Sequence, residues 1–208
     1  MEDVLDVYQR PYDPDRPVVC MDECSKQHLK EVRIPLPAKP GVPERFDTEY
    51  ERSGTSNIFM FFEPLSGKRY TDVTDSRTSI DWALQIKDLV DRTYATATCI
   101  TLVMDNLNTH VGGSLYKAFP PEEAQRILKK LEIHYTPKHG SWLNMAEIEL
   151  SILSRQCLNR RIPDRVSMRK QIAAWEDTRN SSPKAMNWQF TTEDARIKLK
   201  KLYPTYSS

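Results

Sequence analysis

Two short apolar runs, far apart in the chain, each lead directly into an acidic residue. The run Val-Val-Cys-Met at 18–21 ends in Asp22, and the run Ile-Thr-Leu-Val-Met at 100–104 ends in Asp105. Continuous apolar runs of roughly 4 to 8 residues are typical of strands that are buried on both faces of a sheet. We therefore predict two buried central strands, each with a carboxylate at its carboxyl end.

The segments between and after these runs predict the other elements. Residues 58–62 and 69–73 flank the turn residues 64–67 and predict a β-hairpin. Apolar residues at helical spacing follow the capping pair Thr78-Ser79 and predict a helix that ends near Tyr94. The same patterns predict a helix over 120–131, a strand at 133–136, a long helix over 144–158 and helices near 166–178 and 192–202.

The limits of the domain follow from where these patterns stop. Residues 1–16 show no periodicity and contain several prolines and tyrosines, so that we expect a linker or arm. The prolines and the glycine between 33 and 54 predict an extended, irregular loop. With 208 residues, of which 39% are hydrophobic, the chain can bury one core of ordinary size. We therefore assign residues 17–208 to a single domain.

The order of the predicted elements is strand, hairpin, helix, strand, helix, strand, helix, helix. Acids stand at the ends of the first and fourth strands, and a further acid stands on a following helix. This is the order of a ribonuclease H-like domain. We expect an α/β fold in which a mixed five-stranded sheet is flanked by helices. A fold alone does not give a function.

Charge and composition narrow the class of protein. The 30 basic and 29 acidic residues give a net charge of +1, so that any basic DNA-binding face must be local. No apolar run approaches the roughly 20 residues that span a bilayer. The four cysteines form no dense disulfide pattern, and no signal peptide precedes them. We expect no membrane segment and a cytoplasmic location.

One local group of basic residues lies between 155 and 170. A row of this kind along a helix can neutralise phosphates, and it can equally be a solvated helix face. The group comprises Arg155, Arg160, Arg161, Arg165, Arg169 and Lys170.

The strand-end acids suit a metal site for phosphodiester chemistry. Cleavage or transfer of a DNA strand needs an activated attacking oxygen and a neutralised leaving oxygen, which two metal ions about 3.5–4 Å apart provide. Mg²⁺ prefers oxygen ligands, and carboxylates from adjacent strands and a helix leave positions open for water and phosphate. Asp22, Asp105 and Glu147 fit this requirement. Two strand-end aspartates alone are a weak signal, because acids are common where strands meet solvent.

Two strings of residues around these acids are more specific. One is Asp105-Asn106 with His110, and the other runs from Pro137 to Glu147. At these residues the chain resembles the DDE transposases of the Tc/mariner superfamily, and within it the bacterial insertion sequence 630 family. The resemblance extends from about residue 17 to the end of the sequence. Met145 stands where the family frequently has proline.

The resemblance implies a function and its cofactors. It implies that Asp22, Asp105 and Glu147 form an acidic triad that holds two Mg²⁺ (or Mn²⁺) ions. The implied reaction nicks transposon ends and joins the freed 3′-hydroxyl to target DNA. The implied partners are transposon-end DNA, target DNA and a second copy of the chain in a homodimer, in the nucleoid of a bacterial cell. Family members usually carry helix-turn-helix modules ahead of this domain, whereas only about seventeen residues precede the first predicted strand here. We therefore expect an isolated catalytic fragment or a shortened element product.

The third acid and the residues around the triad leave alternatives open. Glu149 competes with Glu147, because both lie at the start of one predicted helix, and the motif favours Glu147. Glu23 should point to the opposite side of the sheet from Asp22. Histidine at 110 could contact a phosphate or merely hold a loop, and tryptophan at 142 could contact DNA or fill the core. The residues expected to bind DNA or to support the metal ligands are Asn106, His110, Lys138, His139, Ser141, Trp142 and Asn144.

Two other functions compete with transposition. A different ribonuclease H-like nuclease, such as an integrase, shares the metal chemistry but does not explain the two specific strings. A catalytically inert, DNA-binding transposase fragment is the second alternative. The presence of all three acids argues against an inert fragment.

Overall fold

A five-stranded mixed sheet organises the protein, whose computed structural model describes residues 1–34, 36–43, 45 and 47–203. The strand order is β3-β2-β1-β4-β5. Strands β1, β2 and β3 pair antiparallel, whereas β4 pairs parallel with both β1 and β5. The bounds are β1 (Val18–Glu31), β2 (Tyr50–Glu63), β3 (Lys68–Thr74), β4 (Ile100–Met104) and β5 (Leu131–Tyr135). The expected mixed five-stranded sheet is confirmed.

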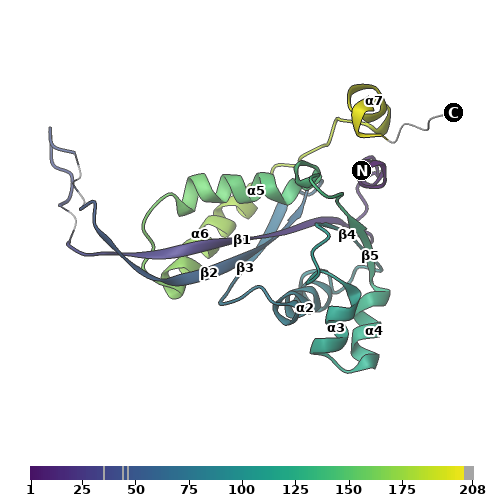
Figure 1. The fold of residues 1–208 in the computed structure, drawn as a ribbon, viewed down its shortest axis with the longest axis horizontal. Helices are drawn as coiled ribbons and strands as arrows, with labels where there is room; N and C mark the ends of the chain where they lie inside the picture. The colour runs from purple at the N-terminus through teal and green to yellow at the C-terminus, as the bar shows by residue number, and fades with distance from the viewer. Residues whose placement is uncertain (35, 44, 46, 204–208) are drawn as a thin grey trace.

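Helices cover both faces of this sheet, with α5 and α6 on one side and α2, α3 and α4 on the other (Figure 1). Their bounds are α2 (Ser79–Asp88), α3 (Gly112–Ala118), α4 (Pro121–Lys129), α5 (Met145–Leu153), α6 (Arg165–Ser181) and α7 (Thr192–Lys198). Single helical turns extend α2 to Thr93 and α5 to Leu158. The predicted capping residue Thr78 accepts a hydrogen bond from the backbone N–H of Asp81. The short helix α3 was not predicted.

Side chains of the central strands alternate between two cores. In β1, Val19 and Met21 join the core under α2–α4, whereas Cys20 joins the core under α5 and α6. In β2, Phe59 and Phe61 face the first core, and Met60 faces the second. Because both faces are covered there, the segments of β1 and β4 that pair with each other are almost entirely apolar. This explains why the two runs that end in acids contain no polar alternation.

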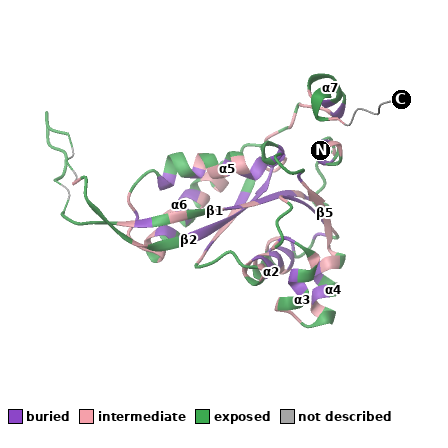
Figure 2. Ribbon diagram, in the orientation of Figure 1, coloured by how far each residue is buried: buried purple, intermediate pink, exposed green. Residues whose placement is uncertain are grey.

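Strand β1 continues well past Asp22, contrary to the expectation that it ends there. Its pairing with β2 continues to Glu31↔Tyr50, so that the two strands form a long hairpin. Isolated bridges Leu36↔Arg45 and Lys39↔Val42 prolong the pairing beyond the strands. The hairpin end projects from the body as an arm and is mostly exposed (Figures 1 and 2). The loop expected over 33–54 is therefore regular from Tyr50 onward.

Residues 1–16 also differ from the irregular N-terminal linker that we expected. Residues Glu2–Tyr8 form helix α1, and four of its side chains are buried in the core under α5 and α6: Val4, Leu5, Val7 and Tyr8. Their spacing places them on one side of a two-turn helix. The prolines and polar residues that follow this short segment obscured the pattern. At the other end, residues 204–208 of the predicted domain lie outside the described residues.

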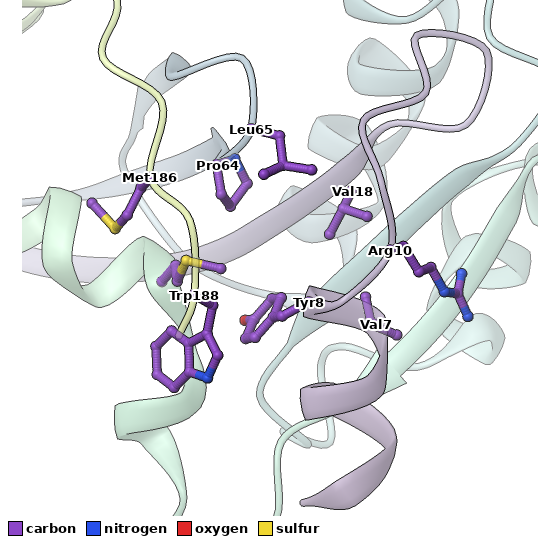
Figure 3. A pocket seen from close by; sticks show the side chains of 9 residues that line it. Val7, Tyr8, Arg10, Val18, Pro64, Leu65, Met186 and Trp188 are labelled. Carbon is purple, nitrogen blue, oxygen red and sulfur yellow. The ribbon is translucent and has the colours of Figure 1, made fainter. Parts of the chain in front are cut away.

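Helices α1 and α7 lie next to each other (Figure 1). Arg196 of α7 forms a bidentate ion pair with Glu2 of α1, at 2.7 and 2.8 Å. The hydroxyl of Thr192 donates a hydrogen bond of 2.6 Å to Asp6. Side chains of α1, the β2–β3 turn and the segment before α7 line a small apolar pocket, in which the Tyr8 and Trp188 rings lie together (Figure 3). In the described part of the chain, no helix has the length and apolar content to cross a membrane.

The burial of α1 predicts a large effect of truncating its central side chain. Leu5 is 0% exposed, and Leu5→Ala should lower the free energy of unfolding by about 2–5 kcal/mol because it leaves a cavity. The matched control is Ile197→Ala, whose side chain is 77% exposed and whose loss should cost less than about 0.5 kcal/mol. Urea unfolding followed by circular dichroism measures both. Equal, small losses in the two variants would show that α1 is not part of the core.

Candidate active site

The parallel pairing of β1 with β4 brings Asp22 and Asp105 to the same level of the sheet. The last register pair is Cys20↔Val103, and each acid lies two residues further along its strand. Asp105 follows the end of β4 directly, whereas Asp22 lies within β1 because the antiparallel partner β2 continues. The two acids are therefore neighbours at the carboxyl end of β4.

Asn144 connects these strands to the helix that carries Glu147. Its side-chain amide donates a hydrogen bond of 2.8 Å to the carbonyl of Met21, and the same nitrogen lies 3.5 Å from Asp22 Oδ2. Its side-chain oxygen caps α5 by accepting from the N–H of Ala146, at 3.1 Å. Glu147 lies in the first turn of α5, with its N–H bonded to the carbonyl of Asn144. One buried amide thus fixes the start of α5 against β1, directly beside Asp22.

The carboxyl group of Asp22 is partly buried among other acids. Its pKa is raised from 3.8 to about 7, mainly by this burial and additionally by the negative charges of Asp105, Glu23 and Glu147, against a hydrogen bond from the N–H of Glu23. Among the described residues, neither Asp22 nor Glu147 forms an ion pair with a basic side chain. The site therefore collects negative charge without a matching protein cation.

Glu149, the competing third acid, forms ion pairs with two arginines. Its carboxylate is 1% exposed and lies 3.0 Å from Arg69 and 3.0 Å from Arg179. Arg69 is itself fully buried, and its backbone N–H and carbonyl are bonded to the side chain of Asn180 in α6. Glu149 thus joins α5 to β3 and α6, and its charge is balanced by two guanidinium groups. Its interactions are those of a structural ion pair, away from Asp22.

Glu23 and His110 form a second polar group behind Asp105. His110 Nδ1 lies 2.5 Å from Asp105 Oδ1, and Nε2 lies 3.1 Å from Glu23 Oε2. Burial opposes the positive charge of His110, but the two carboxylates outweigh it and raise its pKa to about 9. Glu23 points to the α2 side of the sheet, as expected from the alternation along β1. Its contact with His110 was not predicted from the sequence, although the alternation along β1, which turns Glu23 away from Asp22, was the available signal.

The donor set fits a divalent cation rather than a protein cation. Mg²⁺ and Mn²⁺ prefer oxygen ligands, and the raised pKa of Asp22 shows how poorly its charge is tolerated without a counter-ion. Ligand atoms of Glu23, Asp105 and His110 also lie within 4.8 Å of one another. In that second group the ring of His110 already stands between the two carboxylates and supplies the positive charge. The acids without such a partner, Asp22 and Glu147, are those left for a metal ion with Asp105.

The remaining sequence-predicted residues lie around this site with different exposures. Asn106 is exposed after Asp105, and Lys138, His139 and Ser141 are exposed in the loop before α5. His139 has a positive φ of 63°, which turns the chain sharply at this point. Trp142 is 43% exposed and stacks on Trp188 with ring centres 6.3 Å apart, so that it is only partly a core residue.

Three of the basic residues between 155 and 170 are engaged with the sheet. Arg161 pairs with Glu31 and also donates to the carbonyls of Thr48 and Glu49 at the root of the arm. Arg165 pairs with Asp75, and Arg169 pairs with Asp72 at 3.3 Å. These three side chains connect the segment from Arg161 to α6 with strands β1 and β3 and with the residue after β3. Among the described residues, Arg155 and Arg160 each donate one side-chain hydrogen bond, to the carbonyls of Ser151 and Gln156, and their other guanidinium N–H groups have no partner.

A comparison with protein families identifies this arrangement. Residues 17–169 match the family model of the DDE superfamily endonucleases. The chain belongs to this family. The match includes all three acids of the candidate triad and the whole sheet of the DDE domain. Comparison with the curated proteins finds no match.

Solved structures show the same fold as the DDE domain. The Mos1 mariner paired-end complex with Mn matches with a TM-score of 0.57 at 16% identity, over 84% of this chain and 52% of that chain. The Mos1 strand transfer complex matches with a TM-score of 0.55 at 12% identity, over 87% and 51%. These likenesses confirm the ribonuclease H-like fold. The DDE domain spans about half the length of these chains.

The raised pKa of Asp22 predicts how stability depends on pH without metal. A folded-state pKa of about 7 exceeds the ordinary value of 3.8, so that the folded DDE domain binds more protons between these values. The contribution of Asp22 to the free energy of unfolding therefore falls as the pH rises from about 4 to 7. Asp22→Asn should remove that loss and be more stable than the parent at pH 8, by on the order of 1–2 kcal/mol. At pH 4 the two should be equally stable.

Thermal unfolding in a chelator measures this difference, which corresponds to about 2–4 °C per kcal/mol for a chain of this size. Asp177→Asn is the control, because this exposed aspartate of α6 lies outside the site. An Asp22→Asn variant whose stability follows the pH dependence of the parent and of the control would contradict this expectation.

Proposed function

We propose that the DDE domain is the catalytic domain of a transposase that nicks transposon ends and joins the freed 3′-hydroxyl to target DNA. The observation that carries the proposal is the group of three acids around Asp22, in a chain that belongs to the DDE endonucleases. Two of the acids come from neighbouring strands and one from the first turn of α5. We place the protein in the insertion sequence 630 family, on the two strings that contain Asp105 and Glu147.

Asp22, Asp105 and Glu147 would hold two Mg²⁺ (or Mn²⁺) ions. When bound, such ions neutralise charge on the attacking and leaving oxygens of a phosphodiester. The protein side chains supply the arrangement. Asp22 lies within the paired strand β1, the pairing of β1 with β4 brings Asp105 beside it, and Asn144 fixes the helix of Glu147 against β1. With these positions set by the fold, the site needs little rearrangement before the reaction.

Exposed polar residues beside the acids suit contact with a DNA backbone. Lys138, His139 and Ser141 lie in the loop that leads to α5, and Asn106 follows Asp105. Side chains of these kinds make most protein contacts to phosphate and sugar. The half-exposed ring of Trp142 offers a surface on which a base near the cleaved bond can stack. We propose that the DNA lies along this edge of the sheet.

The rival functions make different use of the same site. An integrase or other ribonuclease H-like nuclease would share the metal chemistry, and a panel of transposon-end and other substrates separates it from a transposase. An inert fragment would have no need of a partly buried carboxylate at Asp22 without a basic partner. Residues held in unfavourable states persist at sites of function more than elsewhere. The geometry therefore favours an active enzyme.

We further propose that the protein acts as a homodimer in the bacterial cytoplasm, associated with the nucleoid. The arm between β1 and β2 supports the dimer, because it exposes apolar side chains far from the body of the domain. Ile34 is 93% exposed, Leu36 is 64% exposed and Val42 is 43% exposed. Side chains of this kind gain free energy when a partner covers them.

The proposed activity predicts metal-dependent nicking of supercoiled DNA. The purified chain should nick in Mg²⁺ or Mn²⁺ and not in chelator. Asp22→Asn, Asp105→Asn and Glu147→Gln should each lower the rate by about 10²-fold or more, because each removes a charged ligand. Gel separation of supercoiled and open-circular plasmid, at matched fractions of folded protein, measures the rates. Absence of nicking by the parent chain would support the inert fragment instead.

Glu149 provides the matched control for Glu147. Glu149→Gln alone should destabilise by about 3–5 kcal/mol, because Arg69 keeps a buried charge without its partner. Replacement of both members, Arg69→Met with Glu149→Met, removes the buried charges together and should keep the fold. This double variant should nick at nearly the parent rate. Loss of nicking in the folded double variant would move the third acid from Glu147 to Glu149.

The proposed dimer predicts an effect of charges on the arm. Ile34→Asp combined with Leu36→Asp should weaken self-association by about tenfold or more, because burying either new charge is unfavourable. Ile197→Asp is the control, since this side chain is as accessible, at 77% exposed, but lies on α7. Sedimentation over a range of protein concentrations measures the association. A parent chain that stays monomeric, or equal association in both variants, contradicts the proposal.

A further inference from the structure

His110 is buried between two carboxylates, and its place at the site differs from that of the exposed residues around it. Its side chain is 1% exposed, and that of Glu23 is 2% exposed. Neither side chain is open to DNA in the described structure. We propose that Glu23 and His110 form a positioning chain that fixes one oxygen of Asp105 and leaves the other for the metal ion. This inference rests on the proposed role of Asp105 as a metal ligand.

The ring of His110 is held from several sides. It stacks on the fully buried Trp82 with ring centres 6.0 Å apart and an angle of 27°. Its backbone N–H donates to the carbonyl of Leu107, at 2.9 Å, and its carbonyl accepts from the hydroxyl of Tyr135, at 2.8 Å. The ring is therefore held firmly enough to orient a neighbouring side chain.

Asp105 is such a side chain. It follows the last residue of β4, and its side chain is 31% exposed. Residues 105–108 belong to no helix or strand. Its Oδ1 receives His110 Nδ1 at 2.5 Å. In the described part of the chain, no protein group donates to Oδ2. The carboxylate is thus held by one oxygen, and Oδ2 is the oxygen available to a cation.

Glu23 determines the orientation of the ring. A half-turn of an imidazole about its bond to Cβ replaces both nitrogens by carbons. Such a turn would cost His110 its contact with Asp105 and, at the same time, its 3.1 Å contact with Glu23. Arg77 lies 4.0 Å from the other oxygen of Glu23 and helps to keep this carboxylate in place. The chain from Glu23 to Asp105 therefore has one favoured arrangement.

The alternative is that Glu23, His110 and Asp105 themselves hold a metal ion. Their ligand atoms are close enough for this. However, metal ligation needs a lone pair on a ring nitrogen, and both nitrogens here lie at hydrogen-bonding distance from a carboxylate. Asp22 and Glu147 would then remain without a counter-ion. The geometry favours a positioning role for His110.

Two substitutions at position 110 separate the two ends of the ring. The amide nitrogen of Asn can occupy the place of Nδ1 and donate to Asp105, whereas that of Gln can occupy the place of Nε2 and donate to Glu23. Both variants lose the ring and its stacking on Trp82. Calorimetric titration of Mn²⁺ into the metal-free full chain gives the affinity, and plasmid nicking gives the activity. Thermal unfolding shows the fraction folded.

We expect His110→Asn to bind Mn²⁺ within about threefold of the parent and His110→Gln to bind about 10-fold more weakly or worse, with nicking in the same order. Glu23→Gln should weaken binding by a few-fold, because it keeps the shape and hydrogen-bonding capacity of the side chain but not its charge. This variant tests the same chain from its far end, should the variants at 110 unfold.

The outcomes distinguish the positioning chain from the proposed function. A parent chain that neither binds Mn²⁺ nor nicks DNA contradicts the function itself. A parent that does both, with equal affinities in His110→Asn and His110→Gln, overturns the positioning chain. Equal and complete loss of binding in both variants would assign the metal to Glu23, His110 and Asp105. Unchanged binding in Glu23→Gln would remove Glu23 from the chain.

Discussion

The parallel pairing of β1 with β4 is the constraint on which the rest of the site depends. It places Asp22 and Asp105 side by side, although the sequence separates them by the hairpin and by α2. The pairing is stable because both faces of the two strands are covered by helices. A sheet open to water on one face would need polar alternation in these strands. The same apolar packing that stabilises the domain thus brings two like charges together.

The acids near the end of β4 fall into two groups, those with a basic partner and those without one. Glu149 and Glu23 are buried with cationic partners, and their contacts tie α5 to β3 and β1 to the loop after β4. Asp22 and Glu147 have no such partner among the described residues, and the pKa of Asp22 is raised accordingly. Acids that serve the fold are neutralised by the protein, whereas acids left unneutralised are available for a cation. This difference separates Glu147 from Glu149 more clearly than their position on one helix does.

The sequence was sufficient for the elements whose patterns are long or repeated. Both central strands, the hairpin, the capped helix α2 and the ribonuclease H-like order were predicted because each has a clear apolar period or turn. Helix α1 was missed because two turns carry too little periodicity to stand out beside prolines. The continuation of β1 was missed because its residues beyond Glu23 are mostly polar and show no apolar run, and their strand conformation comes from pairing with β2.

The candidate site shows the same division. The three acids could be chosen from strand ends and motif strings, but the partner of His110 could not. Glu23 and His110 are distant in sequence, and only the fold shows that both lie on the α2 side of the sheet. The ion pair of Glu149 with Arg69 likewise joins segments that no local pattern relates. Local patterns predict which residues are available, and tertiary contacts decide what each of them does.

The loop before α5 shows how widely the third acid depends on the chain. On one side Asn144 holds this loop to β1, and on the other the hydroxyl of Tyr8 donates to the carbonyl of Leu143 at 2.6 Å. Trp142 of the same loop stacks on Trp188, which also packs against Tyr8. Helix α1 and the segment around Trp188 therefore both contact the residues that determine where α5 begins. A change in α1 or in the segment around Trp188 would reach Glu147 through two contacts, without touching an acid.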